Sequence, residues 1–590
     1  MTKAFVRLSQ IGRKGSYSKR ESEAPAELSK SFSLAGPRTS ARNRSPAIIR
    51  GRQRKGMALL VVVVLVMLIS LGAYRFSFYM ESQYRLTRLH EEQVHARLSA
   101  ASGLEFAAAI VEMSQAQRMS IGGLRDNAAA LRDIAVGDSV TETLSTRDPN
   151  VWRFCLVSPA IAEDAKRNTI PSNPVAGTAS LPIRFGLENE SAKLHIPTLI
   201  AWDRLKPGHA RSTLLGLPGV SESMIDGWMR EFGVSTRVDR GVSQNQIASL
   251  DDLRHAWYGG DLNQNYQLDP IEIQLASRLL RRNGAASQQG IDSSRLVGPF
   301  QPLQRFVTWY SGHRNATRNG DPRIYLNDPN LQSLHRRLTM VWSADWANFV
   351  IAMRQFGPSI ALALPIPTAG NPLTSTAPVS SIEMVQEWAP DFGKAPVFTF
   401  RSPLDLAGAV VDLPTMVTSR SPSNVPVSVK RTLRNPFSSD LSAVRNYLGR
   451  ILDDVTVDVS PVSEGRIDVS DAPVEVLAGV PGLDMSLAQR IVQQRSGSLV
   501  TLSKSQELDT IAWLVDIVDL AKLKELEPYL TCRSDVYSVQ AIGYRDNQSA
   551  VYRTTATIDA REYPTQLRNQ KVWHPWDRGF PIEQLAESKP

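Results

Sequence analysis

The chain has 590 residues, with 67 Lys and Arg against 58 Asp and Glu, two Cys, and 42% hydrophobic residues. A single core rarely grows past about 250–300 residues, so we expect several modules. Two cysteines in this length exclude a disulfide-scaffolded mini-domain and a cysteine-rich zinc protein. Cys155 and Cys532 are either one bridge, which an oxidising compartment would allow, or two unrelated buried thiols.

The net charge of +9 belongs to the N-terminal tail. Residues 1–56 carry 14 Lys and Arg and three Glu, a net of +11. The other 534 residues carry 53 basic and 55 acidic groups, a net of −2. The composition therefore does not support a basic surface on residues 57–590 that would bind phosphate groups.

Residues 57–74 (MALLVVVVLVMLISLGAY) form an uncharged apolar run. A helix of this length spans about 27 Å, near the hydrocarbon thickness of a bilayer. The flank before the run, residues 50–55, is rich in Arg and Lys. This bias predicts a single-pass membrane protein whose N-terminus stays in the cytoplasm and whose larger part crosses the bilayer.

The helical pattern continues from Arg75 to about Arg118 without a turn signal. Its apolar positions keep roughly helical spacing. They are Leu86, Leu89, Val94, Leu98, Leu104 and Ala108. We therefore predict one helix of about 60 residues that leaves the membrane and lays this face on a domain.

The segment Lys55-Gly56-Met57-Ala58-Leu59-Leu60 resembles a class III (prepilin) signal. The resemblance implies that a prepilin peptidase cuts after Gly56 and methylates the new amino terminus at Met57. Glycine suits the position because a backbone without a side chain fits a protease cleft. The leader is long for this family, and an ordinary uncleaved signal anchor is the alternative.

The fifth residue after the expected cut is Val61, where most pilins have Glu. In pilin filaments that carboxylate neutralises the amino terminus of the adjacent subunit, and an unpaired charge in apolar surroundings costs several kcal/mol. A subunit without it suits the filament tip. The minor pseudopilin K family of type II secretion also lacks this Glu and is unusually large, so the chain resembles that family.

Further along, three Pro-rich stretches are expected to be loops or linkers: 168–182, 366–380 and 414–427. Short strands and helical blocks mix between them, as in an α+β protein. Residues 536–541 and 550–558 alternate around a polar turn, which predicts a β-hairpin. Residues 563–590 show little periodicity and are predicted to form a loose tail.

An internal repeat relates residues 214–220 (LLGLPGV) to 477–483 (LAGVPGL), and an amphipathic helix follows each copy. This is the helix-hairpin-helix signature, in which glycine permits the tight turn and a polar residue caps the second helix. The residues that mark the turns are Pro218, Gly219, Pro481 and Gly482.

Helix-hairpin-helix turns elsewhere bind the DNA backbone, which requires positive charge at the turn. The first copy is instead surrounded by Glu222, Asp226 and Glu231, and the second has Asp484 in its turn. We therefore favour two helical packing modules over a nucleic-acid site.

Residues 261–272 (DLNQNYQLDPIE) match the spacing of an EF-hand calcium loop. The candidate Ca²⁺ ligands are Asp261, Asn263, Asn265, Gln267 through its carbonyl, Asp269 and Glu272. Tyr266 stands where the sharp turn prefers Gly, and only three ligands are acidic. We expect a weak structural calcium site; an Asn-rich loop without metal is the alternative.

Residues 467–483 (IDVSDAPVEVLAGVPGL) and 530–544 (LTCRSDVYSVQAIGY) also look like the pseudopilin K family, so the resemblance covers most of 50–560. It implies an α+β fold: a long transmembrane pilin helix packed on a pilin-like antiparallel sheet, with a large inserted, mainly helical domain carrying the helix-hairpin-helix (SAM-like) motifs.

The expected organisation is a basic leader that is removed (1–56), a transmembrane segment (57–75), the continuation of the pilin helix (76–118), a pilin-like α+β region (119–200), an inserted helical domain with the first hairpin and the EF-hand-like loop (201–300), an α+β region with Pro- and Ser-rich linkers (301–460), the second hairpin region (461–535), a β-hairpin (536–562) and a tail (563–590).

No motif for catalysis is recognisable, so we expect no enzyme. The resemblance implies an inner-membrane protein with a periplasmic domain that caps the pseudopilus. Its implied partners are the minor pseudopilins of types I and J, the prepilin peptidase, the inner-membrane secretion platform and the lipid bilayer.

Two rivals share some of these features. A competence-type DNA receptor also joins one anchor to helix-hairpin-helix motifs, but it needs a basic exported domain. A minor pilin of a type IV pilus shares the leader and fold, but the size, the duplicated hairpin and Val61 argue against it. Neighbouring genes for a secretin and a secretion ATPase would separate these readings, and no nucleic acid is expected as a partner.

Overall fold

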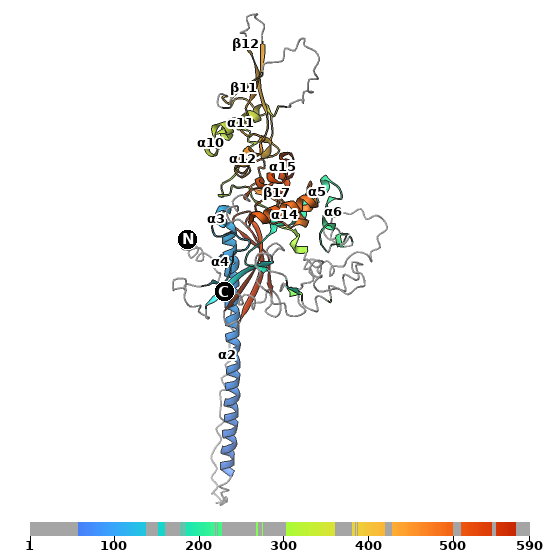
Figure 1. Ribbon diagram of the computed structural model, residues 1–590. Coiled ribbons are helices and arrows are strands. Elements are labelled where there is room, and N and C mark those ends of the chain that lie inside the picture. Colours follow the sequence, from blue (N-terminus) through green and yellow to red (C-terminus); the bar gives the residue numbers. More distant parts are fainter. Residues whose placement is uncertain are drawn as a thin grey trace, which may run out of the picture. The chain divides into compact units, whose positions relative to one another are not determined.

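The computed structural model mixes helices with antiparallel sheet (Figure 1). The chain divides into two compact units, residues 1–80 and residues 81–590. The structure describes the following residues: 57–136, 151–159, 179–180, 183–218, 220, 222, 224–226, 267–268, 274, 303–359, 380–383, 385, 388–418, 427–499, 509–545 and 550–573.

The longest element is helix α2, Met57–Glu112. Its uncharged first part contains no Pro, and its second part is rich in Ala, Leu and Glu, which are strong helix formers. The helix ends six residues before Arg118, where we expected it to end. Ser114 starts a new helix instead, α3 (Gln115–Ser120), because its hydroxyl accepts from the Gln117 amide while the Gln117 side chain accepts from the Ser114 amide.

A seven-stranded sheet lies within residues 81–590, and all its pairings are antiparallel. Its main path runs β1-β2-β18-β19-β20, while β4 pairs with β2 and β5 with β18. The strands are β1 (Ile134–Ala135), β2 (Trp152–Pro159), β4 (Ile183–Arg184), β5 (Glu188–Asn189), β18 (Val536–Arg545), β19 (Val551–Asp559) and β20 (Gln566–Trp573). Strands that are distant in sequence therefore meet in one sheet.

The hairpin predicted near the C-terminus is confirmed, with β18 paired to β19 from Val536↔Asp559 to Tyr544↔Val551. The loose tail predicted from residue 563 is wrong in its first part, because β20 pairs with β19. This strand escapes detection because it is a polar edge strand whose side chains are mostly exposed. An exposed edge does not need the alternation of apolar residues that a half-buried strand shows.

The second part of α2 packs on this sheet through a face that agrees only in part with the predicted one, because Leu104 and Ala108 are buried as predicted. Apart from Glu92, its buried side chains are small or apolar: Ala96, Ser99, Ala100, Leu104, Ala107, Ala108, Ile110 and Val111. Leu104, Ala107, Ile110 and Val111 form a core with Phe154, Leu156, Val539, Ala541, Ala556 and Ile558 of the sheet. Leu86, Leu89, Val94 and Leu98 remain exposed. Small side chains dominate the contact because they allow a helix to approach a strand closely.

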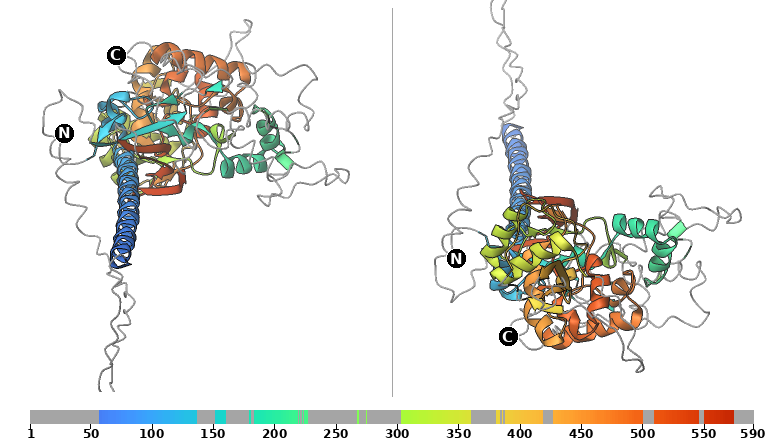
Figure 2. Two further views of the ribbon diagram at one scale, coloured as in Figure 1. Left: turned by 90° about the horizontal axis from the view of Figure 1, so that it is seen from below. Right: turned by 90° about the horizontal axis from the view of Figure 1, so that it is seen from above.

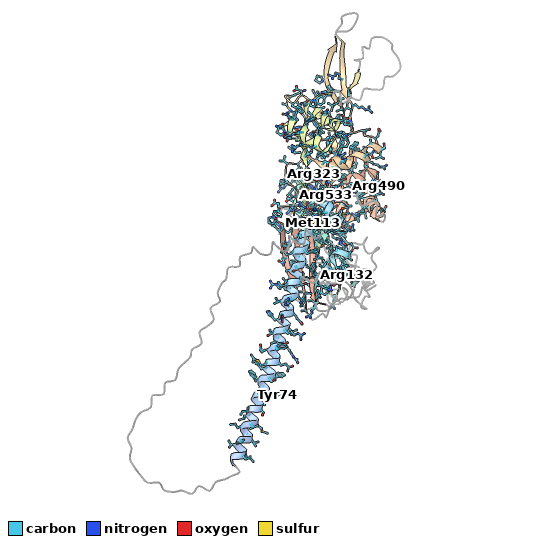
Figure 3. The ribbon with its side chains drawn as sticks, turned by 90° about the vertical axis from the view of Figure 1, so that its left-hand side faces the viewer. Tyr74, Met113, Arg132, Arg323, Arg490 and Arg533 are labelled. Carbon is cyan, nitrogen blue, oxygen red and sulfur yellow. The ribbon has the colours of Figure 1, made fainter. Side chains whose placement is uncertain are left out.

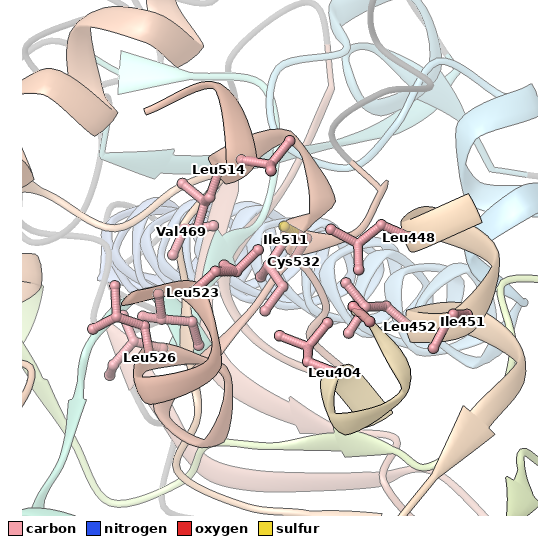
Figure 4. Close-up of a cluster of buried hydrophobic side chains, with 14 of the residues drawn as sticks. Leu404, Leu448, Ile451, Leu452, Val469, Ile511, Leu514, Leu523, Leu526 and Cys532 are labelled. Carbon is pink, nitrogen blue, oxygen red and sulfur yellow. The ribbon is translucent and has the colours of Figure 1, made fainter. Parts of the chain in front are cut away.

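A second and larger core lies among the helices that follow (Figure 4). Leu448 and Ile451 of α12 (Leu441–Asp454) meet Ile511 and Leu514 of η10 (Ile511–Asp516), and Leu523 of α15 (Leu520–Leu526) joins them. The helices α12 to α15 lie together in both views of Figure 2, in orange.

The other helices are α4 (Ala128–Leu131), α5 (Ile196–Leu205), α6 (His209–Leu215), α10 (Leu331–Val341), α11 (Ala344–Phe356), α13 (Val474–Ala478) and α14 (Met485–Leu499), with short 3-10 helices η3 (Glu190–Ala192), η6 (Leu303–Arg305), η8 (Pro403–Leu406) and η11 (Glu527–Tyr529). Asn330 caps α10 by accepting from the Ser333 amide, which suits an Asn at a helix start.

Small sheets connect these helices. A three-stranded sheet has the order β11-β13-β12, from β11 (Ser380–Glu383), β12 (Val411–Thr418) and β13 (Val427–Leu433). Residues 414–418 of the expected linker 414–427 thus belong to a strand. The two-stranded pairs are β3 (Ala179–Ser180) with β7 (Gln267–Leu268), β6 (Leu194–His195) with β8 (Val307–Thr308), β9 (His313–Arg314) with β15 (Val462–Ser463), β10 (Ile324–Tyr325) with β14 (Val455–Thr456), and β16 (Ile467–Asp468) with β17 (Leu530–Thr531).

Candidate functional site

The first candidate is the apolar beginning of α2. The large apolar side chains from Leu59 to Leu71 are 46% to 71% exposed. Among the described residues, α2 alone is long and apolar enough to cross a membrane. Of the predicted processing pair, Met57 is the first residue of this helix and Gly56 lies outside the described residues.

A cluster of aromatic side chains follows the apolar run. Tyr74, Phe76, Phe78, Tyr79 and Tyr84 are all well exposed on α2, and Figure 3 labels Tyr74. Aromatic rings of this kind gather where a helix passes from hydrocarbon to water. We did not single out these residues from the sequence, although aromatic residues clustered at the end of an uncharged run indicate a membrane–water boundary.

Helix α2 and strand β18 touch at a glycine. A Cβ atom at Gly543 would overlap the Ala96 carbonyl oxygen and the Ala100 backbone. One turn further along, a Cβ at Gly103 would lie 2.9 Å from the Phe154 ring of β2. Because both glycines lack a side chain, the helix lies directly on the sheet. The sequence alone offered no means of pairing Gly543 with Ala96, since they are far apart along the chain.

The C-terminal end of α2 is held by arginines from other segments. The last turn of the helix has no basic residue of its own. Arg314 donates to the Glu112 and Met113 carbonyls, both at 3.2 Å, and Arg118 donates to the Met113 carbonyl at 3.0 Å and to that of Val111. Cations at a helix C-terminus satisfy its free carbonyls and stabilise the helix dipole.

Both arginines also bind Asp535. Arg118 forms an ion pair with this carboxylate, and Arg314 donates to it from its guanidinium at 3.2 Å and from its backbone amide at 2.7 Å. Burial by itself would raise the pKa of Asp535, but Arg118 and Arg314 outweigh it and hold the pKa below its ordinary value. The carboxylate is therefore ionised and joins three segments at the end of α2.

A cleft of 550 Å³ opens beside this cluster. Its wall includes Arg118, Asp535, Tyr537 and Asp468. Asp468 accepts from the Asn189 side chain at 2.7 Å and from the Ser470 amide at 2.9 Å, and the described residues give it no ion pair. Burial raises the pKa of its carboxyl to about 6.

The two predicted hairpins meet each other. His209 and Thr213 of α6, in the first motif, contact the Gly479 carbonyl of the second motif at 3.1 and 3.4 Å. A Cβ at Gly479 would overlap the Thr213 methyl group. Pro218 is described, but Gly219 lies outside the described residues.

The turn of the second motif lies between α13 and α14. Gly482 after Pro481 has φ +84°, a conformation that favours glycine. The Glu525 carboxylate lies next to Gly482, and Asp484 caps α14 by accepting from the Leu487 amide at 2.7 Å. This capping bond lowers the pKa of Asp484, so its carboxylate is ionised, while Glu525 pairs with Lys522 at 2.8 Å beside Gly482.

The predicted calcium loop is described only at Gln267 and Leu268, which form β7 and pair with β3. The five other candidate ligands, Asp261, Asn263, Asn265, Asp269 and Glu272, lie outside the described residues. Within the described ranges, no cluster of three or more His, Cys, Asp or Glu is arranged to hold a metal ion.

Both cysteines are buried free thiols, which decides between the two alternatives left by the sequence. Cys155 in β2 lies 3.2 Å from the Tyr544 hydroxyl, and burial raises the pKa of its thiol to about 11. Burial also raises the pKa of Cys532 well above its ordinary value. Neither thiol is available as a thiolate nucleophile at neutral pH.

Comparison of the chain with known protein families, curated proteins and solved structures gave no match.

Proposed function

We propose that this chain is a minor pseudopilin of type II secretion that initiates and caps the pseudopilus. The observation that carries the proposal is α2 itself: one continuous helix of 56 residues, apolar and exposed at its start and docked on an antiparallel sheet at its end. Such a helix supplies a membrane anchor and an assembly element in one piece.

In this proposal the prepilin peptidase cleaves after Gly56, and the processed helix stays in the inner membrane. It then packs with the helices of type I and type J pseudopilins on the secretion platform. The absence of Glu at position 61 leaves no carboxylate for the amino terminus of an adjacent subunit, which suits the tip position.

The exposed apolar residues Leu86, Val94 and Leu98 on the second part of α2 support a helix-packing role. Single exposed apolar residues are ordinary, but these three follow one another along the same helix. A competence-type DNA receptor is less favoured. Its phosphate contacts would need available cations at the hairpin turns, whereas at the second turn Lys522, which lies next to Gly482, is paired with Glu525 at 2.8 Å and Asp484 caps the following helix.

Photo-crosslinking in the native host tests the assembly role. A photoreactive amino acid at Leu86, Val94 or Leu98 is expected to yield adducts with type I and type J pseudopilins. The same probe at Met340, which is 75% exposed near the end of α10, is the control and should yield none of these adducts. Adducts from Met340 alone, or from no α2 position, would contradict the proposal.

We also propose a structural Ca²⁺ site in the loop 261–272. Because only three of its ligands are acidic, we expect a dissociation constant on the order of 10⁻⁴–10⁻³ M. Added Ca²⁺ should raise the unfolding midpoint of the full chain in detergent, and a chelator should reverse this. Glu272→Gln should abolish the response and Glu222→Gln should retain it. A calcium response that persists in Glu272→Gln would place the ion elsewhere.

A further inference from the structure

A small cavity of about 40 Å³ is lined by His313 and Arg533, which lie within two residues of Arg314 and Asp535 in the sequence. Its polar wall is dominated by donors. The lining includes His313, Arg323, Thr456, Arg466, Thr531 and Arg533. Arg323 and Arg533 lie next to each other in Figure 3. Three arginines therefore line a space that is large enough for only a few water molecules.

Two of these guanidiniums have carboxylate partners. Arg533 forms an ion pair with Asp453, and Arg466 forms one with Glu527 at 2.8 Å. Arg323 has no ion pair within the described part of the chain. Its Nε donates to the backbone carbonyl of Asp453 at 3.0 Å, which leaves its charge without a carboxylate partner.

The carboxylates that line the cavity are those of Glu527 and Asp509. Asp509 pairs with Arg318 at 3.1 Å. The carboxylates of Asp453, Glu527 and Asp509 are thus paired with Arg533, Arg466 and Arg318, and among the three cavity-lining arginines Arg323 is the one without an ion pair in the described part of the chain. Burial, followed by the charge of Arg533, lowers the pKa of Arg323 to about 9, so the guanidinium is still protonated at pH 7.

His313 provides an independent observation. The residue is 2% exposed, it lines the cavity, and its Nδ1 has no hydrogen-bond partner among the described residues. Burial, and after it the charges of Arg323, Arg466 and Arg533, hold the pKa of His313 well below its ordinary value. The imidazole is therefore neutral and has one N–H to donate.

We propose that this cavity binds one small monovalent anion of the size of chloride. A cavity needs about 10–15 Å³ to hold one water, so this one has room for a single small anion or for a few waters. The charge of Arg323 favours the anion, because a buried charge without a partner is costly. The anion would accept from Arg323 and its neighbours and join the β9–β10 segment to the segment that follows β17.

The first test measures stability against anion identity. The full chain in detergent is unfolded thermally at constant ionic strength while chloride or bromide replaces gluconate. The wild type should show a saturable upward shift of the midpoint by a few degrees. Arg323→Met should lose this shift. Arg445→Met should keep it, since Arg445 pairs with Asp516 at the surface. No halide-dependent shift in the wild type, or an equal shift in Arg323→Met, would overturn the proposal.

The second test needs no variant and decides the matter if Arg323→Met fails to fold. Crystals of the full chain grown with bromide should show an anomalous peak within hydrogen-bond distance of Arg323. Density in the cavity without an anomalous signal would mean that water fills it, and the proposal would be wrong.

Discussion

At the scale of single residues, Asp535 links segments that are far apart in the sequence. Its carboxylate binds Arg118 and Arg314, its amide donates to the Gly312 carbonyl at 3.0 Å, and its own carbonyl accepts from the Ala560 amide at 2.8 Å. A buried ion pair adds little net stability compared with apolar packing, but removal of one partner leaves an uncompensated charge. The cost of a substitution therefore depends on which charge remains buried.

We predict that Asp535→Asn lowers the free energy of unfolding by about 3–5 kcal/mol, because Arg118 stays buried without its counter-ion. The matched control is Asp516→Asn, which breaks the exposed pair with Arg445 and should cost less than about 1 kcal/mol. Urea unfolding of the full chain in detergent measures both. Equal losses for the two variants would contradict this account of the cluster.

Asp468 gives a prediction for pH dependence. Its folded-state pKa of about 6 lies above the ordinary value of 3.8, so the folded protein binds the proton more tightly than the unfolded chain does. The contribution of Asp468 to stability should therefore be larger at pH 5 than at pH 7 and is lost as the pH rises through about 6, whereas the depressed pKa of His313 acts in the opposite direction. At roughly 1.4 kcal/mol for each pKa unit, the loss over the whole range from below pH 4 to above pH 6 is at most about 3 kcal/mol, and about 1.4 kcal/mol of it falls between pH 5 and pH 7.

The variant Asp468→Asn cannot ionise, so the change in its free energy of unfolding from pH 5 to pH 7 should be more positive than that of the wild type by about 1 kcal/mol. The readout is the difference between the two pH values, so a uniform change in stability from the altered hydrogen bonds to Asn189 and Ser470 does not interfere. An identical pH dependence in variant and wild type would show that Asp468 is not the titrating group.

At the scale of elements, the contact between α2 and β18 depends on Gly543. Gly543→Ala should lower the free energy of unfolding by about 1–3 kcal/mol, since the new methyl group overlaps the backbone of α2. Gly449→Ala in α12 is the control, because its Cβ would lie 3.7 Å from Thr510 and alanine favours a helix interior. Hydrogen exchange in the second part of α2 should rise only for Gly543→Ala.

The sequence allowed some elements to be predicted because their signals are local. The uncharged run after Gly56 predicted the start of α2, and the alternation at residues 536–558 predicted the β18–β19 hairpin. The end of α2 was predicted too late because the cap at Ser114 is a weak signal within an otherwise helical pattern. Strand β20 was missed because an exposed edge strand carries no apolar alternation.

The site was less accessible to sequence reasoning. Of the six positions predicted to form the docking face, Leu104 and Ala108 are buried, whereas Leu86, Leu89, Val94 and Leu98 are exposed and the structure buries Ala96 and Ala100 beside them. A search for apolar residues at helical spacing selects large side chains and passes over alanine. A close contact between a helix and a strand, however, requires small side chains. The ion pairs of Asp535 were not predicted either, since Arg118 and Asp535 are separated by most of the chain.

At the scale of the whole molecule, charge and hydropathy follow a simple order along the sequence. A tail with a net charge of +11 precedes the apolar start of α2, and residues 57–590 carry a net charge of −2. The proposed single-pass anchor, with its basic flank in the cytoplasm, would account for this order. The near-neutral remainder favours a protein assembly partner over nucleic acid.

We propose that the protein is made with a prepilin leader that is removed before α2. The N-terminus of the mature protein tests this proposal most directly. The protein would be extracted from membranes of its native host, and its terminal peptide would be identified by mass spectrometry. We predict a chain that starts at Met57 with a methylated amino group. A chain that still starts at Met1 would contradict the pseudopilin assignment and leave an ordinary signal-anchored protein.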